Sequence, residues 1–452
     1  MSTTAAGSAR VNAILRLEAS LRGSPAYTAA LAIVLAASLA LAAQLMNIAA
    51  HAERLTAFAH ALPYAVVDSS LGPPRRVHFA LIAVGLVQSG VLLLLYRAMR
   101  GREAARGERA VLALIAAAMV VVALRAPAMT GFDAYAYAGY AKLGSLAAAY
   151  TPPPVRFPGE LGVVNDVWGT PLVPCYYGPL WVVLSHAVAG GIASLGGTIL
   201  ALRALEVLAL AAIAFVLAAW RRDAALVALF ALNPAVYALY VANAHNDLFA
   251  VALLLIGAAA ARRAPLAAAC AVAAAALIKI PFAVAALYVF AGRDHLARRA
   301  LWVLAAIALA VGLSLLFGGA AYVHDLLARL HQTSASTGVL YLLTARAIKT
   351  GLLIVACVAL AGAFVRGAVW RTTGWSFIAL GSLTYPWYLI WSLPYAALRR
   401  EVVVAVLVPL PFVAALMEPA FPHLGLGQLA MLAMLIAAAY ELLARKPLPA
   451  EA

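Results

Sequence analysis

The sequence predicts an all-α polytopic membrane protein, because it is rich in apolar residues, poor in charged ones, and contains long apolar runs. Of 452 residues, 66% are hydrophobic and 11% are charged. Soluble domains carry about 45–50% apolar and about 25% charged residues. Runs of about 18–25 apolar residues, which can cross about 30 Å of hydrocarbon, recur between residues 26 and 444. No soluble fold accounts for this composition.

The net charge of +15 would suit a nucleic-acid partner, but the positions of the arginines argue against one. The arginines form short clusters between apolar runs, where cytoplasmic loops of membrane proteins concentrate positive charge. We therefore expect membrane lipids, and no nucleic acid, among the partners.

The arginine clusters also predict the topology. Arginines at 10, 16 and 22 place the N-terminus in the cytoplasm, ahead of a first span that we expect to be retained. The segment 97–109 holds five arginines and two glutamates, so it is cytoplasmic and the segment 127–177 is external. About eleven to fourteen membrane helices are expected. The main spans cover 26–50, 78–98, 110–126, 199–219, 224–241, 246–261, 300–318, 347–366, 373–386, 388–398, 402–416 and 426–444.

The apolar stretch 178–195 does not fit this alternation. If it crossed the membrane, the arginine pairs at 221–222 and 262–263 would lie outside. It opens with Gly178-Pro179 and carries further polar residues and glycines. We expect a helix that lies on, or dips into, the external face; a normal span with a weak charge signal is the alternative.

Two short apolar stretches, 265–278 and 282–291, are separated by a break at Lys279-Ile280-Pro281. Proline interrupts the helical hydrogen-bond ladder, and such broken helices are tolerated at membrane depth only inside protein or beside a cavity. The expected organisation is a cytoplasmic segment (1–25), a single transmembrane domain (26–445) with a large external loop (127–198), and a cytoplasmic tail (446–452).

A carboxylate stands at the start of the external loop, directly after the third span. Asp133 is followed one helical turn later by Tyr137, on the same face. An exposed acid beside tyrosines at the bilayer boundary could act on a hydroxyl-bearing substrate. Alternatively, Asp133 is only the N-cap of a helix that begins at Ala134.

A second polar cluster follows the span 224–241, in the sequence Asn-Ala-His-Asn-Asp at 243–247. Ionisable groups at membrane depth are costly and are candidates for function. Asn246 or Asp247 could simply begin the next helix, but four polar residues in five are more than a cap needs. We therefore favour a functional role that includes His245.

Lys279, in the break between two short helices, needs an anionic partner. A lipid phosphate would suit it, because the lysine would stabilise charge on a departing phosphate. Alternatively, Lys279 pairs with Asp247 for structural reasons. Weaker basic candidates in the external segment 320–349 are His324, Arg329, His331, Arg346 and Lys349.

An aromatic group, Tyr-Pro-Trp-Tyr-Leu-Ile-Trp, occupies 385–391 at an expected external helix end. Aromatic belts at membrane interfaces are ordinary. The spacing of Trp387 and Trp391 also suits a flat platform for a sugar ring.

Five segments together resemble the GT-C superfamily of polyprenyl-phosphate-sugar glycosyltransferases. Phe-Asp-Ala-Tyr-Ala-Tyr at 132–137 looks like the start of the catalytic loop of that superfamily, and Tyr-Tyr-Gly-Pro-Leu-Trp at 176–181 is similar to a later element of the same loop. The segments 243–247, 277–281 and 386–391 also match the pattern. Within the superfamily, the chain most resembles the bacterial alpha-1,6-mannosyltransferases.

The resemblance implies a GT-C type helix bundle with juxtamembrane helices in the first external loop. It implies inverting transfer of a hexose, mannose by resemblance, from a polyprenyl-phosphate carrier to a glycan or glycolipid. The reaction would take place on the external, periplasmic face of a bacterial inner membrane. Asp133 would be the general base. No cofactor is expected, and because the loop has no Asp-x-Asp, no metal ligands either. The substrate-binding candidates are Tyr137, Tyr177, His245, Asn246, Asp247, Lys279, His331, Arg346, Trp387, Tyr388 and Trp391.

A multi-pass transporter or lipid-linked sugar flippase is the alternative, since broken helices and intramembrane polar residues occur there as well. The sequence shows no inverted repeat, and the polar candidates gather near one face rather than at the midplane. A non-catalytic subunit of an envelope assembly is a further alternative.

Overall fold

A computed structural model shows an all-helical chain. The structure describes residues 24–52, 75–127, 133–290, 295–330, 346–366, 389–391, 393, 400–416, 433 and 436, and this part contains no strand. Its longer helices are apolar enough to cross a membrane, which confirms an all-α polytopic membrane protein. These full-length candidates are α2 (Pro25–Ala52), α4 (Arg75–Met99), α5 (Arg106–Arg125), α9 (Leu195–Val216, continued by the π-helical turn Leu217–Arg221) and α15 (Leu296–Leu330).

The expected span 224–241 is broken in the middle. α10 (Ala224–Ala231) is followed by the short α11 (Pro234–Val236) and a π-helical turn, η4 (Tyr237–Val241). The helix axis bends by 47° between α10 and the segment Pro234–Val241. The break falls where Pro234 lacks a backbone N–H. Asn233 stabilises it, because its amide donates to the Leu407 carbonyl at 2.7 Å.

Shorter helices complete the described bundle. The expected break around Pro281 is confirmed, because one helix, α13 (Pro265–Ala276), ends at Ala276. A 3-10 turn, η5 (Ile280–Val284), then leads into the next helix, α14 (Ala285–Val289). The expected spans 373–386 and 426–444 lie outside the described residues, apart from 433 and 436. The remaining helices are α12 (Asp247–Ala260), α13 (Pro265–Ala276), η5 (Ile280–Val284), α14 (Ala285–Val289), α16 (Arg346–Arg366), α19 (Arg400–Leu407) and α20 (Leu410–Leu416).

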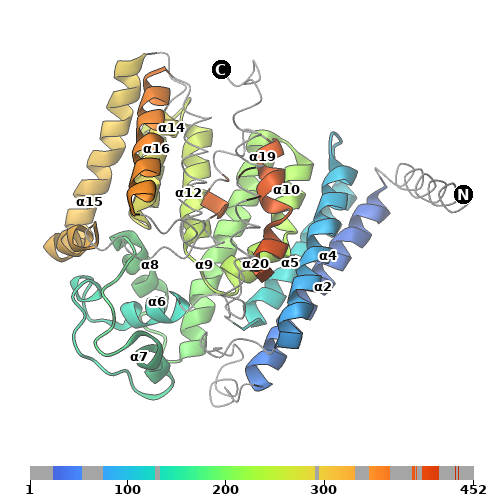
Figure 1. Cartoon of the computed structure of the whole chain (residues 1–452), viewed down its shortest axis with the longest axis horizontal. Coiled ribbons are helices and arrows are strands. Elements are labelled where there is room, and N and C mark those ends of the chain that lie inside the picture. Colours follow the sequence, from blue (N-terminus) through green and yellow to red (C-terminus); the bar gives the residue numbers. More distant parts are fainter. Residues whose placement is uncertain are drawn as a thin grey trace, which may run out of the picture.

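Three short helices from the loop 127–198 lie together at one end of the long helices (Figure 1). They are α6 (Asp133–Lys142), α7 (Gly162–Trp168) and α8 (Pro179–Ala189). The 11 residues of α8 extend only about 16 Å, well short of the about 30 Å of a bilayer core. This length supports the prediction that 178–195 does not cross the membrane.

Polar contacts hold α8 against α6. The Lys142 ammonium donates to the carbonyls of Ala189, at 2.5 Å, and of Ile192, just beyond the end of α8. The His186 ring nitrogen Nδ1 lies 2.9 Å from the Ala141 carbonyl oxygen. The carbonyls at a helix C-terminus have no intrahelical donors, so a cation there stabilises the end of α8.

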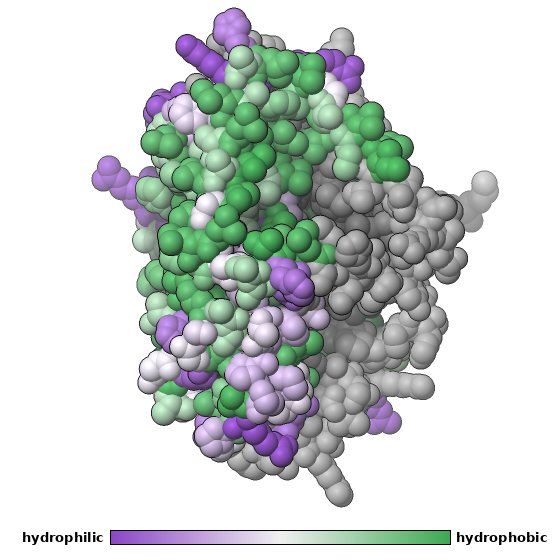
Figure 2. Space-filling view, turned by 90° about the vertical axis from the view of Figure 1, so that its left-hand side faces the viewer, coloured by the Kyte–Doolittle hydropathy of each residue, from purple (hydrophilic) through white to green (hydrophobic). Residues whose placement is uncertain are grey.

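The outer surface of the long helices is apolar. Leu304, Val311 and Leu316 on α15 are all exposed. Figure 2 shows the face that carries α15 as mainly hydrophobic, and more polar at the lower end, where α6–α8 lie in Figure 1. This distribution is the one expected for helices in lipid with a loop layer at the bilayer boundary.

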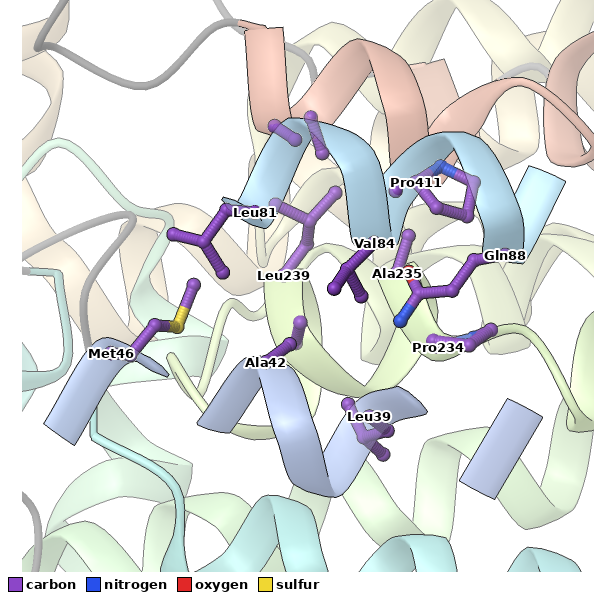
Figure 3. Close-up of a pocket in the computed structure, with 14 residues that line it drawn as sticks. Leu39, Ala42, Met46, Leu81, Val84, Gln88, Pro234, Ala235, Leu239 and Pro411 are labelled. Carbon is purple, nitrogen blue, oxygen red and sulfur yellow. The ribbon is translucent and has the colours of Figure 1, made fainter. Parts of the chain in front are cut away.

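A small apolar cavity lies between α2, α4, the broken 234–239 segment and α20 (Figure 3). Leu39, Val84, Leu239 and Pro411 are among its lining residues, and Gln88 is a polar one. No carboxylate, lysine or histidine lines it. The polar candidates from the sequence therefore lie elsewhere.

One buried arginine joins α9 to α5. Arg203, fully buried on α9, donates to the carbonyls of Leu124 at 2.8 Å, Ala126 at 2.9 Å and Ala123 at 3.3 Å. These groups belong to the last turn of α5 or follow it directly. Arg203 thus supplies donors to the carbonyls at the end of α5, where the helix lacks further amides; the Ala123 carbonyl also accepts from the Ala126 amide.

Replacing Arg203 by methionine should remove these donors while keeping most of the side-chain volume. We expect a loss of about 3 kcal/mol in stability, because hydrogen bonds from a charged group are lost and buried carbonyls are left unsatisfied. Thermal unfolding in detergent measures this as a lower Tm. Arg263→Met, at an exposed arginine after α12, is the control and should leave the Tm unchanged. An unchanged Tm for Arg203→Met would contradict this account.

Candidate active site

Asp133 and His245 face each other across the interface between the loop layer and the bundle. Asp133 is the first residue of α6, and its Oδ2 lies 3.2 Å from Nδ1 of His245. The Asp133 side chain is 21% exposed and that of His245 is fully buried. Asp133 is therefore less exposed than the sequence suggested. Its helix begins at residue 133 itself rather than at Ala134, and its carboxylate is directed to the histidine.

A tight turn brings His245 to this position. Ala244 has a left-handed backbone, with φ of 51°, and the His245 amide donates to the Tyr240 carbonyl at 3.0 Å. The Asn243 side-chain amide donates to the Ala238 carbonyl at 2.6 Å. The chain then turns directly into α12, which begins at Asp247.

The polar residues at the start of α12 do not act as ordinary caps. Asn246 occupies the N-cap position, but its side chain makes no capping hydrogen bond. Its amide oxygen and nitrogen are both buried and have no hydrogen-bond partner among the described residues. The Asn246 side chain therefore does not cap α12.

Lys279 and Asp247 form a second charged pair. The Lys279 ammonium lies 2.9 Å from Oδ1 of Asp247, and the same oxygen accepts a hydrogen bond from the Trp391 indole at 2.5 Å. The lysine nitrogen is also 5.2 Å from the centre of the Trp391 ring and 5.7 Å from that of Tyr177. The pairing of Lys279 with Asp247, the structural alternative raised from the sequence, is therefore present, and two aromatic faces stabilise the cation further.

Backbone contacts dock the loop onto the broken helix. The Gly178 amide donates to the Ile278 carbonyl at 2.8 Å, and the Leu180 amide donates to the Leu277 carbonyl at 3.0 Å. A Cβ atom at Gly178 would lie 2.5 Å from the Leu277 carbonyl carbon. Only glycine allows so close an approach, and this approach brings the neighbouring Tyr177 to Lys279.

Tyr177 connects the two charged pairs. Its hydroxyl interacts with the Asp133 carboxylate, while its ring faces Lys279. Tyr137 is fully buried and packs edge-on against Tyr177, with ring centres 4.7 Å apart, and against Trp181, with ring centres 5.1 Å apart. The structure thus brings together seven of the residues singled out from the sequence, namely Asp133, Tyr137, Tyr177, His245, Asp247, Lys279 and Trp391.

The surroundings of Asp133 favour its ionised form. Burial raises the pKa of the carboxyl, but the hydrogen bond and charge of His245, the charge of Lys279 and the hydrogen bond from Tyr177 outweigh it. The pKa of Asp133 therefore lies below its ordinary value. Burial raises the pKa of the neighbouring Tyr137 well above its ordinary value, so the phenol stays protonated.

The structure does not place every expected residue. His331, Trp387 and Tyr388 lie outside the described residues, and Arg346 begins α16 but its side chain is not described. Within the described segments, no group of three His, Cys, Asp or Glu residues could hold a metal ion.

Two buried ionisable residues on α9 are not among those singled out from the sequence. Arg203 and Glu206 lie one turn apart on α9, and both are fully buried. The sequence could have indicated them, because two ionisable residues interrupt the apolar run 199–219 and such residues within a span are candidates for function.

The fold and the site together define a multi-pass membrane protein. In its site, the Asp133–His245 pair lies close to the Lys279–Asp247 pair, at the contact between the loop helices and the bundle. Residues 31–292, more than half of the chain, match the alpha-(1→6)-mannopyranosyltransferase family, N-terminal domain. The chain belongs to this family and is a glycosyltransferase that acts on mannose. The resemblance to GT-C mannosyltransferases is thereby confirmed. No curated protein and no solved structure matches the chain.

Replacing His245 by glutamine should shift the acidic limb of the pH–rate profile to higher pH. The histidine favours the ionised form of Asp133, so its loss raises the pKa of that carboxyl. The carboxylate is then protonated at a higher pH than in the parent, and kcat/KM falls earlier on acidification. Profiles of parent and variant between pH 4 and about 8 would show this. Coinciding acidic limbs would contradict the proposed coupling.

Replacing Gly178 by alanine should separate the loop from the broken helix. We expect transfer to fall by about 100-fold, because displacing positioning groups by about 1 Å is costly. Gly144→Ala is the control, since a Cβ atom there meets nothing within 4 Å, and it should keep parental activity. Rates for purified protein in liposomes measure the difference, and equal rates for both variants would refute this role of Gly178.

Proposed function

We propose that the protein transfers mannose from a polyprenyl-phosphate carrier to a hydroxyl of a glycan or glycolipid, with inversion at the anomeric carbon. One observation carries this proposal: in a chain of the mannosyltransferase family, Tyr177 contacts both the Asp133–His245 pair and the Lys279–Asp247 pair. One pair presents a base and the other a cation, which are the two groups that this reaction needs.

Asp133 is the general base. Its lowered pKa keeps it ionised at neutral pH, and its partial exposure leaves it accessible to an acceptor hydroxyl. The acceptor oxygen gives its proton to the Asp133 carboxylate as it forms a bond to the anomeric carbon of mannose. His245 holds the carboxylate in place. Attack from the face opposite the phosphate inverts the configuration.

Lys279 stabilises the leaving group. The bond from the anomeric carbon to the phosphate oxygen breaks, and its electron pair leaves with the polyprenyl phosphate. The ammonium of Lys279 offsets the charge that develops on that phosphate. No cofactor is needed in this scheme, because a phosphate leaves readily and the lysine supplies the positive charge.

Aromatic and polar side chains around the two pairs are proposed to bind the substrates. Tyr177 and Trp391 flank Lys279 and offer flat faces to a sugar ring. Tyr137 orders Tyr177, and the unsatisfied amide of Asn246 suits a sugar hydroxyl. The further candidates for contacts to the carrier phosphate or the acceptor are His331, Arg346, Trp387 and Tyr388.

The distribution of charge supports an external, periplasmic site. The arginine-rich segment 97–109 and Asp133 flank opposite ends of α5, whose 20 residues extend about 30 Å. Arginine-rich loops lie in the cytoplasm, which places Asp133 on the other side. We propose this orientation in the bacterial inner membrane, with both chain termini in the cytoplasm.

Replacing Asp133 by asparagine should lower kcat by about 100-fold or more without unfolding the protein, because the base is lost. Purified protein in liposomes that contain polyprenyl-phosphate mannose and a mannosylated acceptor tests this, with NMR of the product reporting the anomeric configuration. Asp166→Asn, at an exposed acid of α7, is the control and should turn over normally.

Normal turnover by Asp133→Asn would refute the assignment of the base. Movement of the lipid-linked sugar across the bilayer without any sugar transfer by the parent would favour a flippase, for which the broken helices at Pro234 and Pro281 would be relevant.

A further inference from the structure

A carboxyl group outside the proposed chemistry lies within the bundle at Glu206. It projects from α9, a membrane-spanning helix, and is fully buried. No described group makes a full hydrogen bond to either of its oxygens. Its electrostatic neighbours are the Asp247 carboxylate, the backbone amide of Phe249 and the Lys279 ammonium. An acid so placed is costly, so it requires a role.

The first backbone amides of α12 need hydrogen-bond acceptors from outside the helix. The first helical hydrogen bond runs from the Ala250 amide to the Asn246 carbonyl, at 3.2 Å. The three preceding amides, of residues 247–249, therefore have no acceptor within the helix. The side chain of Asn246 does not cap them. Glu206 projects from α9, and the Phe249 amide in this turn is one of its electrostatic neighbours.

The same turn carries half of the proposed site. Asp247 is its first residue and holds both Lys279 and the Trp391 indole. His245, two residues earlier, holds Asp133. Displacement of the first turn of α12 would therefore move both charged pairs.

We propose that Glu206 is a positioning residue that anchors the N-terminus of α12 and thereby aligns Lys279, through Asp247, for the phosphate of the lipid-linked donor. The carboxyl faces the Phe249 amide, so a polar group of this length is what the position requires. This inference rests on the proposed function of Lys279.

Arg203 provides a matched control on the same helix, one turn away. Its described hydrogen bonds go to α5 and to the residues that follow it, not to the charged pairs. Both residues are fully buried. Loss of either side chain disturbs α9, but only the loss of Glu206 acts on the first turn of α12.

The test measures kcat and the KM for polyprenyl-phosphate mannose in liposomes for Glu206→Leu, Glu206→Gln, Glu206→Asp and Arg203→Met. We expect Glu206→Leu and the shorter Glu206→Asp to raise the donor KM by about tenfold, the scale of one lost buried polar contact. Glu206→Gln keeps an acceptor of equal reach and should stay near the parent. Arg203→Met should lower the Tm and leave the donor KM unchanged.

Backbone amide exchange gives a readout that does not depend on activity. The amides of residues 247–249 should exchange faster in Glu206→Asp than in the parent and should be protected in Glu206→Gln. Exchange in Glu206→Asp equal to the parent would overturn the anchoring role, even if Glu206→Leu does not fold.

Three kinetic outcomes would overturn the proposal: a parental donor KM in Glu206→Leu and Glu206→Asp, a defect in Glu206→Gln as large as that in Glu206→Leu, or an equal rise in donor KM for Arg203→Met. Asp133→Asn is measured beside them. Normal transfer by that variant refutes the proposed base, whereas its inactivity beside unaffected Glu206 variants refutes only the role of Glu206.

Discussion

The contact on which the site depends is the pair of backbone hydrogen bonds between the external loop and the broken helix. The break before Pro281 leaves the carbonyls of Leu277 and Ile278 without helical donors, which is costly away from water. The amides of Gly178 and Leu180 satisfy these two carbonyls. The break and the loop therefore stabilise each other.

This contact explains how groups far apart in the chain form one site. Docking at Gly178 sets Tyr177 beside Lys279, and Tyr177 in turn reaches Asp133 at the start of the same loop. The broken span before the 243–247 turn adds His245 and Asp247 from another side. The proposed base, Asp133, and the Lys279 ammonium are thus held in fixed relation by backbone geometry as well as by their charges.

The charges themselves are arranged in pairs because single buried charges are unfavourable in a bilayer. Asp247 pairs with Lys279, and Asp133 lies against His245. In the proposed reaction, the incoming phosphate is an additional anion, and the lysine is the cation that it would meet among the described residues of the site. The apolar outer surface of the long helices would keep the site at the depth of the phosphate of such a lipid-borne substrate.

By itself, the sequence determined the membrane class and the break at Lys279-Pro281, and it singled out Asp133 and the 243–247 cluster as candidates, because hydropathy, proline and ionisable residues are local properties of the chain. It did not reveal that Asp133 meets His245, that Tyr177 joins the two pairs, or that Glu206 faces the start of α12. Those relations connect residues separated by up to about a hundred positions and depend on how α6, α8, α9 and α12 pack. Only the tertiary structure decides them, since helical periodicity specifies which face of a helix is buried but not which partner lies against it.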